Sequence, residues 1–339
     1  MIEPAKDGAI WTYECPTLAS FLDLYSEHYL GNKAMIFRGH ARWDWELKSS
    51  LRRELEKHDP EEVDLLIRHP RRFAPGFQEF VDHMYITGSD SIRALVDEYQ
   101  QLYQRAGSTE TKQYRDERIR QRLNDDYTPV DPEVTNRQER LRVLDGKILG
   151  LAQHYGLPTP LIDWTYSPFV AWFFALADVA FPPDRPQVVA MSAATLQGQI
   201  DSYVTAEIER RKEGALKASR PPDRGDFSDL VELERFCVVD GFLPENDRFV
   251  AQSGVLTNQS VRFSLEEIAR MTWQGDDTPC IVRFELGEQR ETALRILRRM
   301  NVHGGTLFPG PAGGARLGLD SIRFENYSGL KGALLPGLV

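Results

Sequence analysis

The chain has 339 residues, of which 41% are hydrophobic and 27% are charged. This composition is typical of a globular protein and excludes a wholly disordered chain, a collagen-like repeat and a coiled coil. The 41 Lys and Arg residues against 51 Asp and Glu give a net charge of −10, which argues against bulk attraction to nucleic acid and leaves room for a local basic cleft.

No targeting or membrane signal is found in the sequence. Residues 1–17 lack the basic segment and apolar run of a secretory signal, and the most apolar window, 169–181, is too short to span a bilayer. The three cysteines are far apart and have no metal-ligand spacing. We therefore expect a cytoplasmic protein without disulfides, without a bound metal and without a membrane segment.

Hydrophobic spacing in the first part of the chain predicts several helices and one short strand. The expected elements are a helix over 17–30, a strand over 34–37, a turn passing into a helix over 43–57, and two helical stretches within 76–105. Residues 108–140 are almost all polar and carry charges of both signs. This pattern favours an exposed insertion or arm with a solvated charged face over a nucleic-acid-binding arm.

The rest of the chain alternates between short apolar runs and amphipathic segments. The expected elements are helices over 144–155 and 167–180, a polar helix within 197–240, a helix over 289–300, and strands over 160–164, 187–192, 248–257 and 280–286. Ser167 is a suitable N-cap, and the tail after residue 300 is rich in Gly and Pro. Interspersed strands and helices indicate an α/β or α+β protein.

The first candidate site residue stands in the run Phe37-Arg38-Gly39-His40, at the end of a predicted strand. An arginine there is costly to bury without a partner, and its guanidinium can bind phosphate or carboxylate with two parallel hydrogen bonds. Gly39 would let a ligand or another backbone approach closely. The alternative, equally supported, is a structural arginine that pairs with a buried carboxylate or with carbonyls.

A second group of polar side chains lies where one predicted helix ends and the next begins. His154 is a candidate general base with Asp163 to orient it, but no activated nucleophile stands beside it, so a structural role for His154 is favoured. Asp163 and Thr165 precede a helix N-terminus, where backbone N–H groups can hold phosphate. Asp163 would repel an anion but could bind a ribose hydroxyl.

The predicted strand over 248–257 contains the third candidate group. Alternation along a strand places Arg248 and Gln252 on one face, so both are expected to face one cleft. An edge strand with a polar outer face is at least as well supported by this pattern.

Together these motifs resemble the FRG domain family, named for residues that stand here as Phe37-Arg38-Gly39. The resemblance lies in the runs FRGHARWDWELKSSLRRE, LAQHYGLPTPLIDWTYSPFVAWFFALAD and RFVAQSGVLT and covers about residues 15–315. Pro160 departs from the family pattern, where an arginine is usual, so a basic contact is expected to be missing. The expected organisation is an N-terminal helical segment over 1–33, an FRG domain over 34–315 with a charged helical insertion over about 76–140, and a C-terminal tail over 316–339.

The order of the motifs is also similar to that of ADP-ribosyltransferases of the arginine-serine-glutamate type. In this resemblance Arg38-Gly39 opens an NAD site, Asp163-Trp164-Thr165 stands at the Ser-Thr-Ser strand, and the run AWFFA matches the end of the next helix. It implies an α+β fold with a mixed or split β-sheet flanked by helices. It also implies an NAD site formed by residues around these motifs, namely Arg38, Gly39, His40, Tyr155, Trp164, Thr165, Ser167 and Arg248.

The third element of that family is Glu-x-Glu, and Gln252-Ser253-Gly254 takes its place here. The glutamate that stabilises an oxocarbenium-like transition state would fall at Gly254, which supplies no charge, and Gln252 can only position a group. Asp163 is then the first candidate for the missing acid. The alternative is a nucleotide cleft without transferase activity.

Three hypotheses for the function follow. The first is an enzyme that binds NAD around Arg38 and transfers ADP-ribose to a protein or nucleic-acid acceptor, or hydrolyses NAD, with Arg38, Asp163, Gln252 and His154 as catalytic residues. The second is a non-enzymatic module that senses a nucleotide, nucleic acid or protein in a bacterial defence or toxin system. The third, a phosphodiester hydrolase built on His154 and Asp163, ranks last because the sequence has no metal-ligand set.

Overall fold

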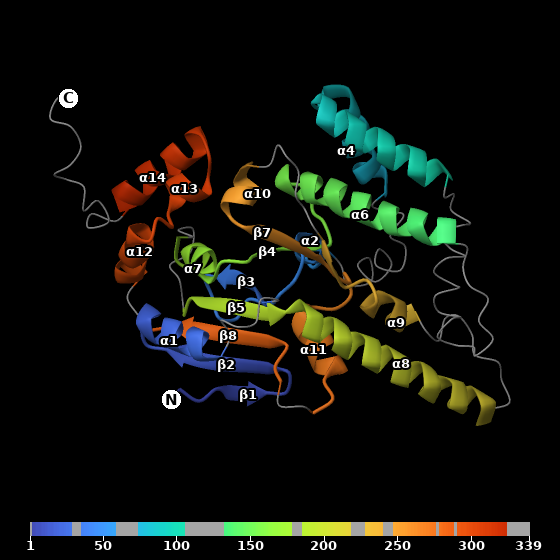
Figure 1. Ribbon diagram of the computed structural model, residues 1–339, viewed down its shortest axis with the longest axis horizontal. Helices are drawn as coiled ribbons and strands as arrows, with labels where there is room; N and C mark the ends of the chain where they lie inside the picture. Colours follow the sequence, from blue (N-terminus) through green and yellow to red (C-terminus); the bar gives the residue numbers. More distant parts are fainter. Residues whose placement is uncertain are drawn as a thin grey trace.

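The computed structural model describes residues 2–28, 35–58, 74–105, 132–177, 185–217, 228–239, 247–275, 278–287 and 290–323. Within these ranges the strands form one eight-stranded sheet in the order β1-β2-β8-β5-β3-β4-β7-β6 (Figure 1). β2 and β8 run parallel, and all the other neighbouring strands run antiparallel. The prediction of an α+β protein with a mixed sheet is confirmed.

The strands are β1 (Ala5–Asp7), β2 (Ile10–Cys15), β3 (Met35–His40), β4 (Leu161–Thr165), β5 (Gln187–Ser192), β6 (Cys237–Val239), β7 (Gly254–Asn258) and β8 (Ile281–Leu286). The first helices are α1 (Leu18–His28), α2 (Ser50–Leu55), α4 (Ala74–Thr87), α6 (Pro132–His154), α7 (Pro168–Ala177) and α8 (Ala193–Lys217). They are followed by α9 (Ser228–Leu233), α10 (Asp247–Ala251), α11 (Leu265–Thr272), α12 (Arg290–Arg299), α13 (Gly304–Leu307) and α14 (Pro311–Arg323). Residues 90–105 are also helical.

Helices cover both faces of the sheet, because the central strands are apolar on both sides. In β5 every residue is buried; Val188 and Ala190 pack with α1, α7 and α12, whereas Val189 and Met191 pack with α8, α9 and α11. This alternation follows from the two-residue period of a strand.

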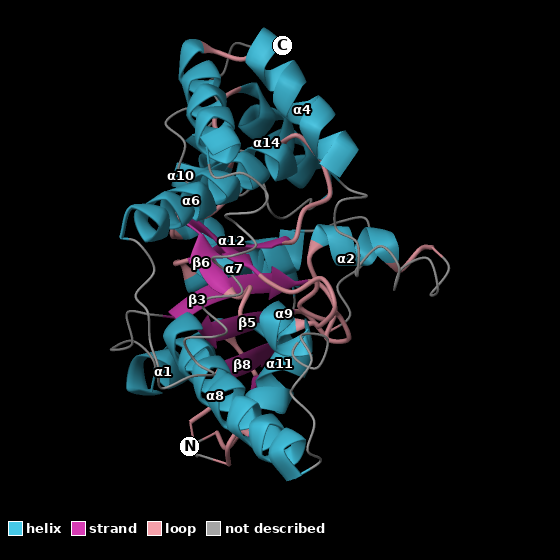
Figure 2. Cartoon of the chain, turned by 90° about the vertical axis from the view of Figure 1, so that its right-hand side faces the viewer, coloured by secondary structure: helices cyan, strands magenta, loops and turns pink. Residues whose placement is uncertain are grey.

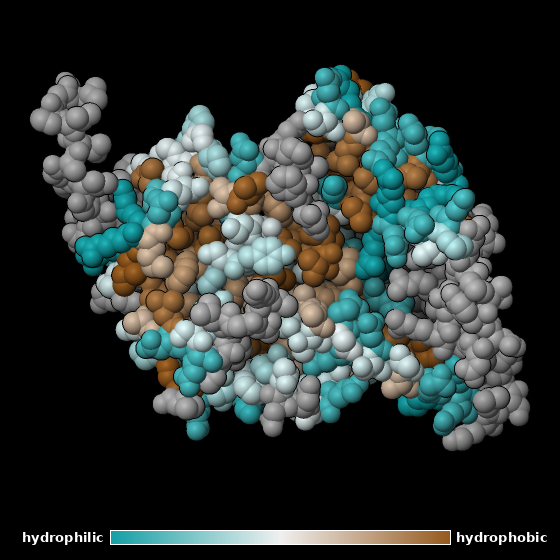
Figure 3. Space-filling view, in the orientation of Figure 1, coloured by the Kyte–Doolittle hydropathy of each residue, from teal (hydrophilic) through white to brown (hydrophobic). Residues whose placement is uncertain are grey.

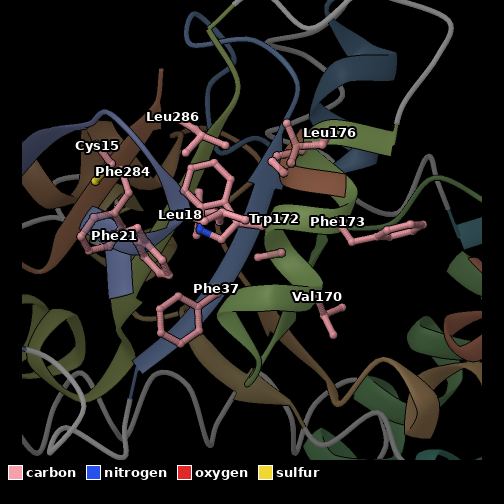
Figure 4. Close-up of a cluster of buried hydrophobic side chains, with 14 of the residues drawn as sticks. Cys15, Leu18, Phe21, Phe37, Val170, Trp172, Phe173, Leu176, Phe284 and Leu286 are labelled. Atoms are coloured by element: carbon pink, nitrogen blue, oxygen red, sulfur yellow. The ribbon is translucent and has the colours of Figure 1, made fainter. Parts of the chain in front are cut away.

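Aromatic side chains fill the first of these two cores. Trp172 of α7 meets Phe21 of α1 edge to face, with ring centroids 5.5 Å apart, and Phe21 meets Phe284 of β8 in the same way at 5.1 Å (Figure 4). Edge-to-face contacts of this kind add to the stabilisation from burial. They fix α7 over the sheet, next to the end of β3.

A helical unit lies beyond the β6 edge of the sheet (Figure 2). Its helices, α4, 90–105 and α6, share a separate hydrophobic cluster that includes Val81, Val96 and Ile148. The prediction of two helical stretches within 76–105 is confirmed, since α4 ends at Thr87 and the next helix begins at residue 90. Most of the predicted polar arm, residues 106–131, lies outside the described residues, and 132–140 form the first part of α6.

Three predictions about individual segments were wrong or incomplete. The N-terminal segment is not only helical, because β1 and β2 precede α1 and β2 pairs with β8. The first part of the predicted strand 248–257 is the short helix α10, and β7 begins at Gly254. The Gly- and Pro-rich tail contains α13 and α14, so a helix continues past residue 315.

The sheet is weakly joined at its centre. β3 and β5 pair at six positions, whereas β3 and β4 pair at one position, Phe37 opposite Thr165. The two strands therefore diverge beyond Phe37, and this divergence positions the candidate site. None of the described helices combines the length and apolar character that crossing a membrane requires.

Candidate functional site

A cavity of about 540 Å³ lies where β3, β4 and β7 meet. Its remaining walls come from α6, α7 and α10, together with Phe308 and Arg316. Small-molecule sites typically enclose about 300–1,000 Å³, so the cavity has the size of a ligand site. Of the predicted site residues, eight line it, namely Arg38, Gly39, His154, Asp163, Trp164, Thr165, Arg248 and Gln252.

Arg38 bridges β3 and β4 just after their single backbone pair. Its Nη1 donates to the main-chain oxygen of Asp163 at 2.6 Å, and its Nε donates to Nε2 of His40 at 3.2 Å. The side chain is 21% exposed, and its Nη2 has no hydrogen-bond partner within the described ranges. Burial lowers the pKa of Arg38 while Asp163 raises it; the guanidinium stays charged at neutral pH.

His40 supports Arg38 through a hydrogen bond and does not itself line the cavity. It is 3% exposed. Because its Nε2 accepts from Arg38, the proton must lie on Nδ1, which is buried. Burial and then the positive charge of Arg38 hold the pKa of His40 well below its usual value. A neutral His40 therefore fixes the orientation of the guanidinium.

Gly39 is required by helix packing. A Cβ at this position would lie 2.0 Å from the main-chain oxygen of Ala171 and 2.6 Å from the nitrogen of Ala175. The backbone that approaches Gly39 closely is therefore that of α7. This contact places α7, and with it the apolar wall of the cavity, against the strand that carries Arg38.

Asp163 presents its carboxylate to the cavity and is held by Gln153. The side chain is 67% exposed, and Oδ2 lies 4.0 Å from Nη1 of Arg38. Oδ1 accepts a hydrogen bond from Nε2 of Gln153 at 2.7 Å, and Oε1 of Gln153 accepts in turn from the hydroxyl of Thr159. The sequence did not indicate Gln153 as the partner of Asp163, although Gln153 stands in the run LAQHYGLPTPLIDWTYSPFVAWFFALAD.

Among the described residues no hydrogen bond joins His154 to Asp163, its candidate orienting partner. His154 packs edge to face on Tyr155, with ring centroids 5.3 Å apart, while Gln153 takes the hydrogen bond to the carboxylate. Burial and the nearby Arg248 lower the pKa of His154. Tyr155 is 62% exposed and lies outside the cavity lining.

Thr165 and Ser167 fix the turn from β4 into α7. The hydroxyl of Thr165 donates to the main-chain oxygen of Gln252 at 2.7 Å and accepts from the backbone N–H of Ser167 at 3.0 Å. The hydroxyl of Ser167 accepts from the N–H of Val170, which confirms the predicted cap. Trp164 directs its ring into the opposite core, where its Nε1 donates to Thr257 at 2.9 Å. These side chains shape the site, and their polar atoms are already bonded within the protein.

Arg248 and Gln252 share one side of the cavity because they stand four residues apart at α10. The predicted shared face is present, but a helical turn produces it instead of strand alternation. Nε2 of Gln252 donates to the main-chain oxygen of Leu307 at 3.0 Å, and Arg248 lies over the ring of Phe308 with its Cζ 4.6 Å from the centroid. Both residues connect α10 to the chain around α13.

Phe249 occupies the space beside Gly254 that a longer side chain would need. A Cβ at Gly254 would lie 2.6 Å from Cδ2 and 2.7 Å from Cε2 of Phe249. A glutamate at residue 254 would therefore clash with this ring. Among the described residues Asp163 is the one carboxylate that lines the cavity.

Several residues that line the cavity were not predicted. Phe174 and Phe308 meet edge to face with centroids 6.1 Å apart, and Arg316 lies over Phe308 at 5.8 Å. Hydrophobic residues lie on the surface at α10, whereas hydrophilic residues cover the outer ends of α6 and α8 (Figure 3). Phe174 stands in the run LAQHYGLPTPLIDWTYSPFVAWFFALAD, whereas Phe308 and Arg316 stand in the Gly- and Pro-rich tail, which has no recognisable pattern.

No group of three or more His, Cys, Asp or Glu side chains that could hold a metal ion is found in the described part of the chain. The three cysteines are free, and Cys15 and Cys280 are buried. Burial raises the pKa of Cys15 to about 12, so this thiol is not ionised at neutral pH.

Comparison with known proteins gives one positive result. The FRG domain family matches residues 33–181, which contain β3, β4 and α7 with Arg38 and Asp163. No curated protein matches the chain, and no solved structure matches it. The run Phe37-Arg38-Gly39 thus lies in a segment of the chain that matches the FRG domain family.

Proposed function

We propose that the cavity binds a phosphorylated nucleotide, with NAD as the first ligand to test. The observation that carries this proposal is the charge of the lining, in which Arg38, Arg248 and Arg316 stand against the single carboxylate of Asp163. Guanidinium groups bind phosphate through paired, charge-assisted hydrogen bonds. The chain as a whole has a net charge of −10, so this positive lining is a local feature and not a consequence of composition.

Aromatic side chains beside the arginines support the same ligand class. Phe174 and Trp45, which is 36% exposed, line the cavity, and the ring of Phe308 beside them lies under Arg248 and Arg316. Flat apolar surfaces of this kind suit a nucleobase or a nicotinamide ring. The cavity thus combines positively charged side chains that can bind phosphate with apolar side chains that can contact the ring of a nucleotide.

A purely structural role for Arg38 accounts for only part of its hydrogen-bonding capacity. The bonds to Asp163 and His40 use two donors, whereas a guanidinium has five. The side chain also remains partly exposed to the cavity. Arg38 therefore joins the two strands and still has donors for an anion.

Titration calorimetry with NAD and ADP tests this proposal. We expect a saturable isotherm for the wild-type protein and a loss of affinity of about tenfold or more in Arg38→Lys, because one charged donor group replaces a planar fork. Arg93→Ala, an exposed arginine of the helical unit, is the matched control and should bind as the wild type does. Circular dichroism checks that each variant is folded. Absence of binding by the wild-type protein would contradict the proposal.

Asp163 favours a second function, hydrolysis of NAD or transfer of its ADP-ribose. When the bond between ribose C1′ and the nicotinamide nitrogen breaks, the electron pair leaves with nicotinamide and positive charge develops on the ribose. A fixed carboxylate beside the cavity would stabilise that charge and take a proton from the attacking water or acceptor. Gln153 and Thr159 hold the carboxylate in place.

Release of nicotinamide, measured by chromatography, tests the second function. We expect Asp163→Asn to lower the rate by about 10²-fold or more while NAD still binds, since the substitution removes charge and keeps the shape. Binding of NAD without nicotinamide release by the wild-type protein would favour a nucleotide sensor instead. A toxin role would further require that expression lowers the NAD content and growth of bacterial cells, and that Asp163→Asn restores both.

A further inference from the structure

Two arginines from different parts of the chain lie over one aromatic ring at the cavity. Cζ of Arg248, on α10, lies 4.6 Å from the centroid of Phe308, and Cζ of Arg316, on α14, lies 5.8 Å from it. All three side chains line the cavity. The positively charged guanidiniums of Arg248 and Arg316 therefore both lie beside the ring of Phe308.

This arrangement leaves hydrogen-bond donors without acceptors. The guanidinium of Arg248 makes no hydrogen bond within the described ranges, and its Coulombic neighbours are Asp163, which attracts it, and Arg316, which repels it. Arg316 donates from Nη2 to the main-chain oxygen of Ala177 at 2.9 Å, while its Nε is buried and has no hydrogen-bond partner in the part of the chain that the structure describes. Paired cations with unused donors are stabilised by an anion placed between them.

The pair is also connected to the first anion-binding group. Asp163 interacts electrostatically with both Arg38 and Arg248, and Arg248 interacts with Arg316. Arg38 is mostly buried, whereas Arg248 is exposed. The three guanidiniums thus line one cavity at different degrees of burial, and that of Arg316 is half-buried.

The wall that carries the pair is held in place by hydrogen bonds. Gln252 joins α10 to the end of α13 through the oxygen of Leu307, and Arg316 joins α14 to the end of α7 through Ala177. The two cations are thereby fixed relative to the strands that carry Arg38 and Asp163. Preorganised donors of this kind favour binding because less ordering is needed when the ligand arrives.

We propose that Arg248, Phe308 and Arg316 form a second anion subsite, and that the ligand carries a pyrophosphate. The substrate class is then a nucleoside diphosphate or a pyrophosphate-bridged dinucleotide in preference to a nucleoside monophosphate. This inference rests on the proposed nucleotide binding and adds the number of phosphates that the site recognises. The remaining role of Arg316, donation to a carbonyl at the C-terminal end of α7, uses one of its five donors.

Titration calorimetry with ADP, AMP and inorganic pyrophosphate tests the inference. We expect the wild-type protein to bind ADP about tenfold or more tightly than AMP, and to bind pyrophosphate in competition with ADP. Arg248→Gln should reduce this preference for ADP to about twofold or less while the affinity for AMP stays nearly constant. Arg316→Lys should reduce it in the same direction, and Arg93→Ala should leave it unchanged. Thermal unfolding of each variant checks that the protein still folds when the hydrogen bond from Arg316 to Ala177 is changed.

The outcomes separate the two proposals. If AMP and ADP bind the wild-type protein equally well, or if Arg248→Gln weakens both by the same factor, the second subsite is refuted while nucleotide binding at Arg38 stands. If no nucleotide binds the wild-type protein, both proposals fail. A selective loss of ADP and pyrophosphate affinity supports the subsite.

Discussion

A neutral histidine holds a charged arginine at the centre of the candidate site. His40 accepts from Nε of Arg38, and burial and the neighbouring positive charges keep the pKa of His40 well below its usual value. The signal for Arg38 is local, because the run Phe37-Arg38-Gly39-His40 is visible in the sequence. The role of His40 depends on the fold, because the sequence does not show that this side chain at the end of β3 is buried outside the cavity lining.

Stability should therefore depend on pH through His40. The unfolded chain takes up a proton on this residue below about pH 6.5, whereas the folded protein does not, so unfolding becomes more favourable as the pH falls. The contribution of His40 is complete above its unfolded pKa and is lost below it.

Urea unfolding at about pH 7.5 and about pH 5 measures this effect. His40→Gln, which keeps an acceptor and does not titrate, should lose less stability between the two pH values than the wild type. The pKa values of His154 and His303 are also lowered, and both residues are present in each protein, so the difference isolates His40. Equal losses in the two proteins would contradict its assigned protonation state.

Gly39→Ala should destabilise the protein through overpacking. The added Cβ would overlap the main chain of α7 at Ala171, and a backbone helix cannot move aside as a flexible side chain can. We expect a loss of about 1–3 kcal/mol or more. Gly198→Ala in α8 is the matched control, because an added Cβ there would have no described atom outside its own helix backbone and chain neighbours within 4 Å. This substitution should stabilise the protein by about 0.5–1 kcal/mol. An unchanged unfolding midpoint in Gly39→Ala would show that α7 does not pack on β3 as described.

At the scale of elements, prediction succeeded where the pattern and the packing agree. The apolar runs of β5 and β8 and the amphipathic α12 lie at the predicted places. Prediction failed where tertiary contacts override the local pattern. Alternating residues suggested a strand where α10 forms. The segment of α14 is helical although it contains three glycines, because Leu317 packs beside Gly305 and Arg316 donates to the main-chain oxygen of Ala177.

A buried ion pair fixes the loop that follows β3. The backbone N–H of Leu47 donates to both carboxylate oxygens of Glu266 in α11, at 3.0 and 2.9 Å, and Arg283 of β8 donates to Oε1 at 2.8 Å. The Glu266 side chain is 2% exposed. The hydrogen bonds between Leu47 and Glu266 connect the loop that carries Trp45 to helix α11.

Glu266→Met should cost about 3–5 kcal/mol, because it leaves Arg283 buried without its partner. The double variant Glu266→Met with Arg283→Met should recover part of this loss, since both charges are then removed. Chemical denaturation measures the free energy of unfolding of each protein. Additive losses in the double variant would contradict the assigned pairing.

At the scale of the whole molecule, the candidate site extends beyond the segment that the family matches. Residues 33–181 contain Arg38 and Asp163, whereas Arg248, Phe308 and Arg316 follow it in the chain. The sequence motifs indicated Arg38, Asp163 and Gln252 because they stand in recognisable runs. Nothing local indicated that Arg316 would reach the same cavity, since its position depends on how α14 packs against α7.

The fragment 33–181 should not fold alone. Within it β3 would keep β4 as its neighbour, joined at one position, and would lose β5, to which it pairs at six. The core around α7 would also lose Phe284 of β8 and Leu294 of α12. We expect an unfolded or aggregated fragment by circular dichroism and size-exclusion chromatography, with the full chain as control. A cooperatively folding fragment would show that the matched segment is an independent domain.

The most direct test of the account is a crystal structure of the protein with ADP or NAD. The account predicts a nucleotide in the cavity between β3, β4 and α10, with a phosphate oxygen within hydrogen-bond distance of Nη2 of Arg38 and the second phosphate beside Arg248. A nucleotide bound elsewhere on the protein, or an empty cavity in crystals grown with saturating nucleotide, would contradict it.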